Sequence, residues 1–137
     1  MHMPVKVKVV TVIERGEERD RLELSAAGKM FRKGDSVYLQ YEEKLEEGIV
    51  NTTVKMKKED VLILRSGAVK MRLHLLAEKE TPGTYQSPYG LLQTTAATKR
   101  LTQIADNTAN RGVIEAVYDL SLGGDHAGTY HLRIDYK

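Results

Sequence analysis

The side chains with the greatest capacity for chemistry in this sequence are a few arginines, histidines and tyrosines in its second half. Arg65, His74 and Arg133 each lie in a segment where apolar and polar residues alternate. If all three point into one interior, they form a cationic cavity suited to an anionic ligand. If they point to solvent, they are ordinary surface residues, and the cost of burying unpaired cations favours that orientation.

The segment Tyr85-Gln86-Ser87-Pro88-Tyr89-Gly90 is a second candidate for a binding surface. It concentrates two tyrosines, a Ser-Pro bond and a glycine between two expected strands, and proline restricts both itself and the residue before it. Tyr85 and Tyr89 would then present hydrogen-bonding surface at one end of the fold. In the alternative interpretation Tyr89 only plugs that end, and the residues around it shape the turn into the next strand.

Known catalytic and metal-binding motifs are absent from the sequence. It contains no Gly-rich phosphate loop, no His-Glu-x-x-His, no Gly-x-Ser-x-Gly and no cysteine. His126 lies in a glycine-rich turn without further metal ligands beside it. We therefore assign no catalytic residue, no metal and no cofactor. The remaining enzymatic hypothesis uses His74 or His131 as a general base, with Asp119 or Asp135 as its orienting carboxylate.

Composition and charge indicate one ordinary domain. The 137 residues are 41% hydrophobic and 29% charged, which leaves no room for a second core. No apolar stretch resembles a signal peptide or a membrane span, so we expect a cytoplasmic protein without membrane contact. We expect residues 1–3 to be disordered or introduced for expression, and leave them out of the functional argument.

Alternation of period two recurs between turn residues along the whole chain, and this pattern predicts strands rather than helices. Val5, Val7 and Val9 alternate with lysines, and a β-bulge or a local twist would explain the break in phase at Val10 and Val12. Residues 96–105 could pass for a short helix, but their threonine-rich pattern favours a strand. Residues 81–90 are expected to be the main irregular loop.

A meander of so many strands must close on itself or leave two edges free to pair with other chains. We therefore predict an all-β fold in which residues 1–137 form one antiparallel meander barrel of about 8–10 strands, lipocalin- or calycin-like. A two-sheet sandwich is the alternative, but it usually needs long crossovers, and only residues 81–90 could supply one.

Four segments together resemble the YwiB-like family of small bacterial β-barrel proteins. They are residues 64–69, 85–90, 113–120 and 132–136. The resemblance implies a lipocalin-like barrel over most of the chain from about residue 61 onward. It implies no activity, because no catalytic or ligand-binding residues are agreed for that family.

These observations leave two main hypotheses for function. The first is a protein that binds a small, anionic ligand at one barrel end through Arg65, His74, Tyr85, Tyr89 and Arg133. One Phe and no Trp argue against a large hydrophobic ligand. The second is a structural or regulatory protein that forms homo-oligomers or contacts a partner through an edge strand or the tyrosine-rich segment.

An enzyme ranks below both hypotheses, and a nucleic-acid-binding protein ranks last. The net charge of +2 is too small to indicate a nucleic-acid partner. The basic residues that would carry such binding are Lys55, Lys57, Lys58, Lys70 and Arg72.

Overall fold

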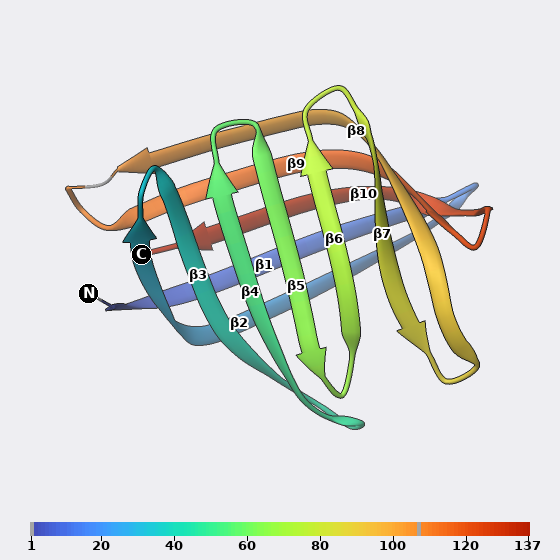
Figure 1. Cartoon of the computed structure of the whole chain (residues 1–137), viewed down its shortest axis with the longest axis horizontal. Coiled ribbons are helices and arrows are strands. Elements are labelled where there is room, and N and C mark those ends of the chain that lie inside the picture. The colour runs from blue at the N-terminus through green and yellow to red at the C-terminus, as the bar shows by residue number, and fades with distance from the viewer. Residues whose placement is uncertain (1, 107) are drawn as a thin grey trace.

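Ten β-strands follow one another along the chain with short turns between them (Figure 1). The computed structural model describes residues 2–106 and 108–137. The strands are β1 (Met3–Arg15), β2 (Glu18–Lys33), β3 (Ser36–Leu45), β4 (Gly48–Lys57), β5 (Asp60–Gly67), β6 (Lys70–Leu76), β7 (Glu80–Ser87), β8 (Gly90–Asp106), β9 (Arg111–Leu122) and β10 (Asp125–Tyr136).

The strands form one closed antiparallel barrel. Each strand pairs with its neighbours in the chain, and β1 pairs with β10 to close the sheet. The predicted all-β meander barrel is therefore confirmed. The sandwich alternative is wrong, because no crossover is present in the described chain. Closure does not pair every segment on both sides, because β2 pairs with β3 only from Gly28 onward, and residues 18–27 of β2 pair with β1 alone among the described strands. A contact through an edge strand therefore stays a prediction.

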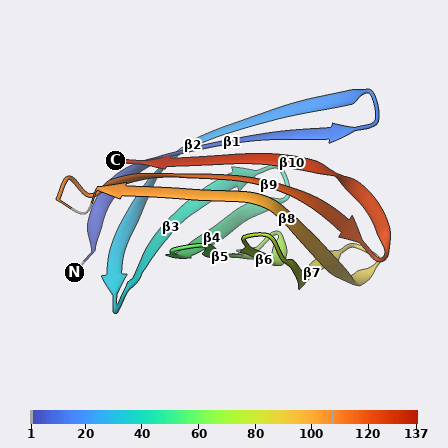
Figure 2. The same cartoon turned by 90° about the horizontal axis from the view of Figure 1, so that it is seen from above.

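Two sets of strands cross each other steeply around the interior. β3 to β7 run one way, and β9, β10, β1 and β2 run across them (Figure 1). Seen from above, the two sets lie on opposite sides of the interior, and β8 bends from one to the other (Figure 2). β8 carries a register shift between Thr98 and Arg100 against β9, a bulge that lets a strand bend.

Glycine is needed where β2 begins to pair with β3. Gly28 is the first residue of that pairing, opposite Tyr41. A Cβ atom at Gly28 would lie 2.7 Å from the backbone oxygen of Gln40 and 2.9 Å from a methyl carbon of Val7. The two strands approach this closely only because residue 28 has no side chain.

The core is built by the alternation that predicted the strands. Every second residue of most strands points inward, and the largest fully buried side chains are Met30, Leu39, Met56, Leu75, Ile114, Ile134, Val7, Val50, Val54 and Val61. Each such side chain contributes about 1.5–3 kcal/mol to stability by leaving water. The bulge expected near Val10 is not found, because β1 pairs with both neighbours without a register shift. Val10 and Val12 are outward-facing and half-buried.

Residues 81–90 are not the irregular loop that their prolines and glycines predicted. Residues up to Ser87 belong to β7, which forms a tight hairpin with β8. The helical alternative for residues 96–105 is also wrong, since they lie within β8.

The expectation that residues 1–3 are disordered or introduced for expression is corrected in part. Met3 is the first residue of β1 and pairs with Met30. Met1 lies outside the described residues, and so does Asn107, the first residue of a turn that the sequence predicts over residues 107–112. Among the described residues, no helix is both long and apolar enough to cross a membrane.

Candidate functional site

One end of the barrel brings together part of the candidate residues. The turns at residues 16–17, 46–47, 68–69, 88–89 and 123–124 all lie at this end, because alternate hairpins of an antiparallel meander share one end. We call this end the mouth. Arg65 and Tyr85 lie on inward-facing positions of β5 and β7, each two residues before the strand ends there.

Arg65 points into the barrel and forms an ion pair there. Its Nη2 atom lies 2.9 Å from Oε1 of Glu43, and the two side chains are only 25% and 17% exposed. Arg65 lies opposite Thr52 of β4 on one side and Met71 of β6 on the other. The pair therefore spans β4 on the inner wall of the barrel, just inside the mouth.

The alternation within each strand explains both orientations. On β5 the buried Val61 and Ile63 precede Arg65 at two-residue spacing, and on β3 the buried Tyr41 precedes Glu43 in the same way. Side chains two residues apart in a strand share a face, so Arg65 and Glu43 continue the inner face. Sequence reasoning missed Glu43, although its spacing from Tyr41 was a usable signal.

Buried tyrosines lie beneath this ion pair. Burial raises the pKa of Tyr41 to about 12; the Glu43 carboxylate adds to that rise and the Arg65 guanidinium opposes it. Burial also raises the pKa of Tyr118, again against the effect of Arg65. The ring of Tyr118 stacks on that of Tyr130 with centroids 5.3 Å apart. The charge of Arg65 thus acts on phenol groups from opposite walls of the interior.

Further polar groups face the interior along β8. The hydroxyl oxygens of Thr94 and Thr98 are buried and have no hydrogen-bond partner among the described residues. Thr98 lies opposite Tyr118 in the β8–β9 pairing. Most buried polar atoms in proteins are hydrogen-bonded. The inner wall at these two hydroxyl groups is therefore suited to binding water or another small polar molecule.

Tyr85 shares a cross-strand row with Arg65. Tyr85 lies opposite Met71, and Met71 lies opposite Arg65, so all three side chains belong to one inward-facing row across β5, β6 and β7. Tyr85 is half-buried at the mouth. The structure therefore places two of the five candidate residues on one wall, with Met71 between them.

Tyr89 is at the same end but outside the barrel. Its side chain is 100% exposed at the tip of the β7–β8 turn, so the idea that it plugs the barrel is wrong. Ser87 closes this turn, since its Oγ accepts a hydrogen bond from the Tyr89 backbone nitrogen at 3.1 Å and donates to the Gly90 oxygen at 2.9 Å.

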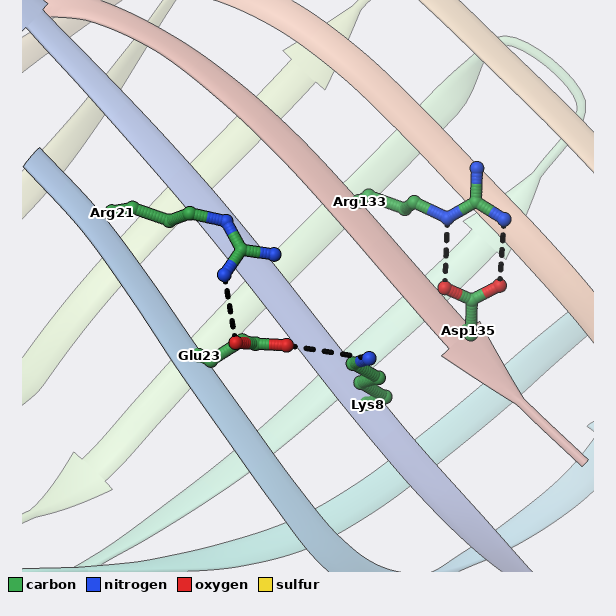
Figure 3. A network of polar contacts seen from close by, with 5 residues as sticks. All are labelled: Lys8, Arg21, Glu23, Arg133 and Asp135. Atoms are coloured by element: carbon green, nitrogen blue, oxygen red, sulfur yellow. Dashed lines mark hydrogen bonds and ion pairs between the residues drawn. The ribbon is translucent and has the colours of Figure 1, made fainter. Parts of the chain in front are cut away.

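His74 and Arg133 lie on the outer face and do not join Arg65. His74 stands between the buried Leu73 and Leu75 in β6 and therefore points outward. Arg133 points outward from β10, where it contacts Asp135 at 2.9 Å (Figure 3). It also contacts Glu115 at 2.7 Å. A common cationic cavity of the three residues is therefore not formed.

The histidines form carboxylate pairs, but with partners other than those expected. His74 Nε2 lies 2.7 Å from Asp60, and His131 Nε2 lies 2.8 Å from Glu14. Neither contacts Asp119 or Asp135 in the described structure. His126 is the histidine near Asp119, at 3.7 Å. Among the described residues, no group of three His, Cys, Asp or Glu side chains is placed to hold a metal ion.

Comparison with known proteins gives the family but no activity. A family model described as "Domain of unknown function (DUF1934)" matches residues 7–134. The chain is 31% identical to the "Uncharacterized beta-barrel protein YwiB" of Bacillus subtilis over 134 residues, which cover 98% of this chain and 93% of that protein. The crystal structure of the ywiB protein from Bacillus subtilis superposes with a TM-score of 0.88 over 99% of this chain and 92% of that one. The resemblance to YwiB-like barrels is thus confirmed, and the chain belongs to the DUF1934 family of β-barrel proteins.

Proposed function

We propose that this protein binds a small carboxylate-bearing ligand at the mouth of the barrel, with Arg65 as the anchoring cation. The observation that carries the proposal is an arginine on the inner wall whose hydrogen-bonding capacity is mostly unused. A guanidinium group has five N–H donors. In the described structure its side chain makes one polar contact, the Nη2 bond to Glu43.

The free donors suit a carboxylate or phosphate group. A guanidinium has two planar forks for the two oxygens of one anion, Nε with Nη2 and Nη1 with Nη2. Glu43 accepts only one of the two Nη2 hydrogens, so one fork of Arg65 stays available. Arg65 is 25% exposed, so such an anion reaches it without unfolding the wall. A partly desolvated arginine binds an anion more strongly than one in bulk water.

The surroundings limit the size and polarity of the ligand. Met71 and Tyr85 border Arg65 on the inner wall, and the exposed Leu45 ends β3 at the mouth. Deeper positions are filled by the hydrophobic core. The ligand that fits is a short molecule with one anionic head and a small apolar part, held above Tyr41 and Tyr118.

Hexanoate and its neutral amide, hexanamide, form a suitable pair of probes for an NMR titration of the ¹⁵N-labelled protein. We expect saturable amide shifts around Arg65 and Tyr85 with hexanoate and none with hexanamide. Arg65→Met removes the response. The matched control is Arg133→Met, which deletes an outer-face arginine and leaves the response intact. Binding that survives Arg65→Met, or no saturable response to hexanoate, would overturn the proposal.

A protein-contact role is the second candidate function, and the β7–β8 turn favours it. Tyr89 is fully exposed there and Leu91, two residues later, is 59% exposed, so this hairpin tip presents two large side chains to a partner. Light scattering of the wild type and of Tyr89→Ser/Leu91→Ser across concentrations tests self-association. A concentration-dependent mass that the double substitution abolishes supports homo-oligomers, and a constant monomer mass excludes them.

A further inference from the structure

A long, open hollow lies on the outer face of the barrel, toward the end opposite the mouth. It has a volume of about 1120 Å³ and is lined by residues of β1, β2, β8, β9 and β10. We call it the outer hollow. It is separate from the Arg65 site, since Arg65, Glu43 and Tyr85 are not among its lining residues. Most of its lining side chains face outward, and the buried Val7 and Tyr136 lie at its base.

Small residues form the floor of the outer hollow, and longer side chains form its walls. Ser25, Ala27 and Gly112 lie among its lining residues. Ile104 is 75% exposed at its border. Val10 and Val113 add half-buried apolar surface. The break in alternation at Val10 therefore marks an apolar residue placed outside the barrel.

Positive charge is in excess along this hollow. Among its lining side chains the carboxylates are Asp106 and Asp135, and the cations are Lys6, Lys8, Arg21, Arg111, Arg133 and Lys137. Two further carboxylates, Glu23 and Glu115, pair with lining cations. The hollow therefore favours an anionic partner.

Two of these cations face each other without a counter-charge on their side chains. Lys6 and Lys137 exchange backbone hydrogen bonds, with N···O distances of 2.7 Å and 3.0 Å. Directly opposite residues of an antiparallel pair point to the same face. Neither ammonium group has an ion pair in the described part of the chain. Like charges placed opposite each other are destabilising, so an anion between them would relieve repulsion.

The remaining cations are held by exposed ion pairs that a partner could replace. Lys8 and Arg21 both contact Glu23, at 3.3 Å and 2.8 Å (Figure 3). The side chains of these pairs are about half exposed. Exposed ion pairs contribute about 0–1 kcal/mol, so carboxylates from another molecule can take their place at little cost.

We infer that the outer hollow is a docking surface for an acidic segment of another protein, in extended conformation and with apolar side chains between its carboxylates. A small molecule fits less well, because small-molecule sites are usually enclosed clefts of about 300–1,000 Å³. An extended segment alternates its side chains, so acidic residues can meet the lysines while apolar ones contact Val10, Val113 and Ile104.

Fluorescence anisotropy with a labelled peptide of alternating Glu and Leu residues tests this inference. We expect saturable binding that weakens steeply between about 50 and 500 mM salt. Lys6→Gln/Lys137→Gln should weaken binding roughly tenfold, as expected for the loss of two ionic contacts. The matched control is Lys70→Gln/Lys79→Gln, which removes the same charge elsewhere and leaves affinity unchanged.

Three results would overturn the inference: no saturable binding, equal losses in the two double variants, or binding of an oligothymidylate of equal charge as tight as that of the peptide. The last result would show a general polyanion surface. Circular dichroism of both variants verifies that each retains the barrel. Since Arg65 lies elsewhere, this test does not depend on the proposed ligand site.

Discussion

Arg65 and Glu43 meet inside the barrel although β4 lies between their strands. Their atoms Nη2 and Oε1 are 2.9 Å apart, with Thr52 opposite Arg65 on the intervening strand. A charged pair on an inner wall is costly to desolvate, and aliphatic residues would fill the position without that cost. The pair therefore gives the mouth a polarity that the stability of the barrel does not require.

The energetics of the ion pair can be measured by denaturation. Removing only one partner leaves the other charge without compensation, so Arg65→Met should lower the free energy of unfolding by about 1–2 kcal/mol, less than for a fully buried pair. Arg65→Met/Glu43→Leu should recover most of that loss. Urea titrations of the single and double variants give both values. A double variant as unstable as the sum of the two single variants would contradict this coupling.

The Glu43 carboxylate should compete with a bound anion. Glu43→Gln keeps the size of the side chain and removes its charge, so it should raise the affinity for hexanoate roughly tenfold. The same substitution should not raise the affinity for leucine, whose ammonium group the carboxylate attracts. Parallel NMR titrations with hexanoate and leucine measure the two changes. Equal changes for both probes would mean that the charge of Glu43 does not distinguish them, which would contradict this prediction.

Tyr41 links stability to alkaline pH. Its pKa is raised to about 12 in the fold by burial, from an ordinary value near 10. The folded state therefore retains a proton that the unfolded state loses, so this contribution is complete below about pH 10 and is lost as the pH rises toward 12. Tyr41→Phe should show a smaller alkaline loss of stability than the wild type. Urea titrations at about pH 9 and pH 11 measure the difference, and parallel losses would count against it.

Asp119 makes the stability of the fold depend on pH in the acid range, where stability falls as the pH is lowered. The hydroxyl of Thr129 donates a hydrogen bond of 2.6 Å to it, and this bond, together with Lys99 and His126, lowers the pKa of Asp119. A carboxyl with a lowered pKa stabilises the fold above its ordinary value near 4, and that contribution is lost as the pH falls through the folded pKa. Thr129→Val should flatten the fall in Tm below about pH 4. If the Tm of the variant falls below about pH 4 as steeply as that of the wild type, Thr129 does not set the pKa of Asp119.

Gly28 should tolerate no side chain. Because a Cβ there would overlap the backbone oxygen of Gln40, Gly28→Ala should destabilise the barrel by about 1–3 kcal/mol through forced backbone movement. The matched control is Ala27→Val, which enlarges the exposed neighbouring residue. Thermal denaturation compares the two, and a neutral Gly28→Ala would mean that β2 and β3 separate without cost.

The alternation of apolar and polar residues predicts nine of the ten strands, and β7 is the strand that it misses. Pro82 and Gly83 indicated a loop because proline lacks a backbone donor. The β6–β7 pairing covers only Lys70 to Arg72 on β6 and ends at Thr84 on β7. Pro82 lies beyond that limit, so no ladder hydrogen bond is lost. Strand composition cannot reveal where a neighbouring strand stops pairing.

The candidate site was predictable in part. The spacing of Arg65 from Val61 and Ile63 already placed it on the apolar face of its strand, whereas His74 alternates with leucines and belongs to the other face. Their separation could thus have been deduced from local sequence. The contact between Arg65 and Glu43 could not, because it depends on the registers of two successive hairpins.

The pairing of β1 with β10 also has a consequence for synthesis of the protein. The first strand leaves the ribosome with one side unpaired, and its partner on that side is the last strand to be made. Until then the growing sheet exposes two edges that can pair with other chains. Barrel closure joins residues separated by nearly the whole chain, a contact that slows folding. The moment of greatest risk of aggregation is therefore the interval just before β10 emerges.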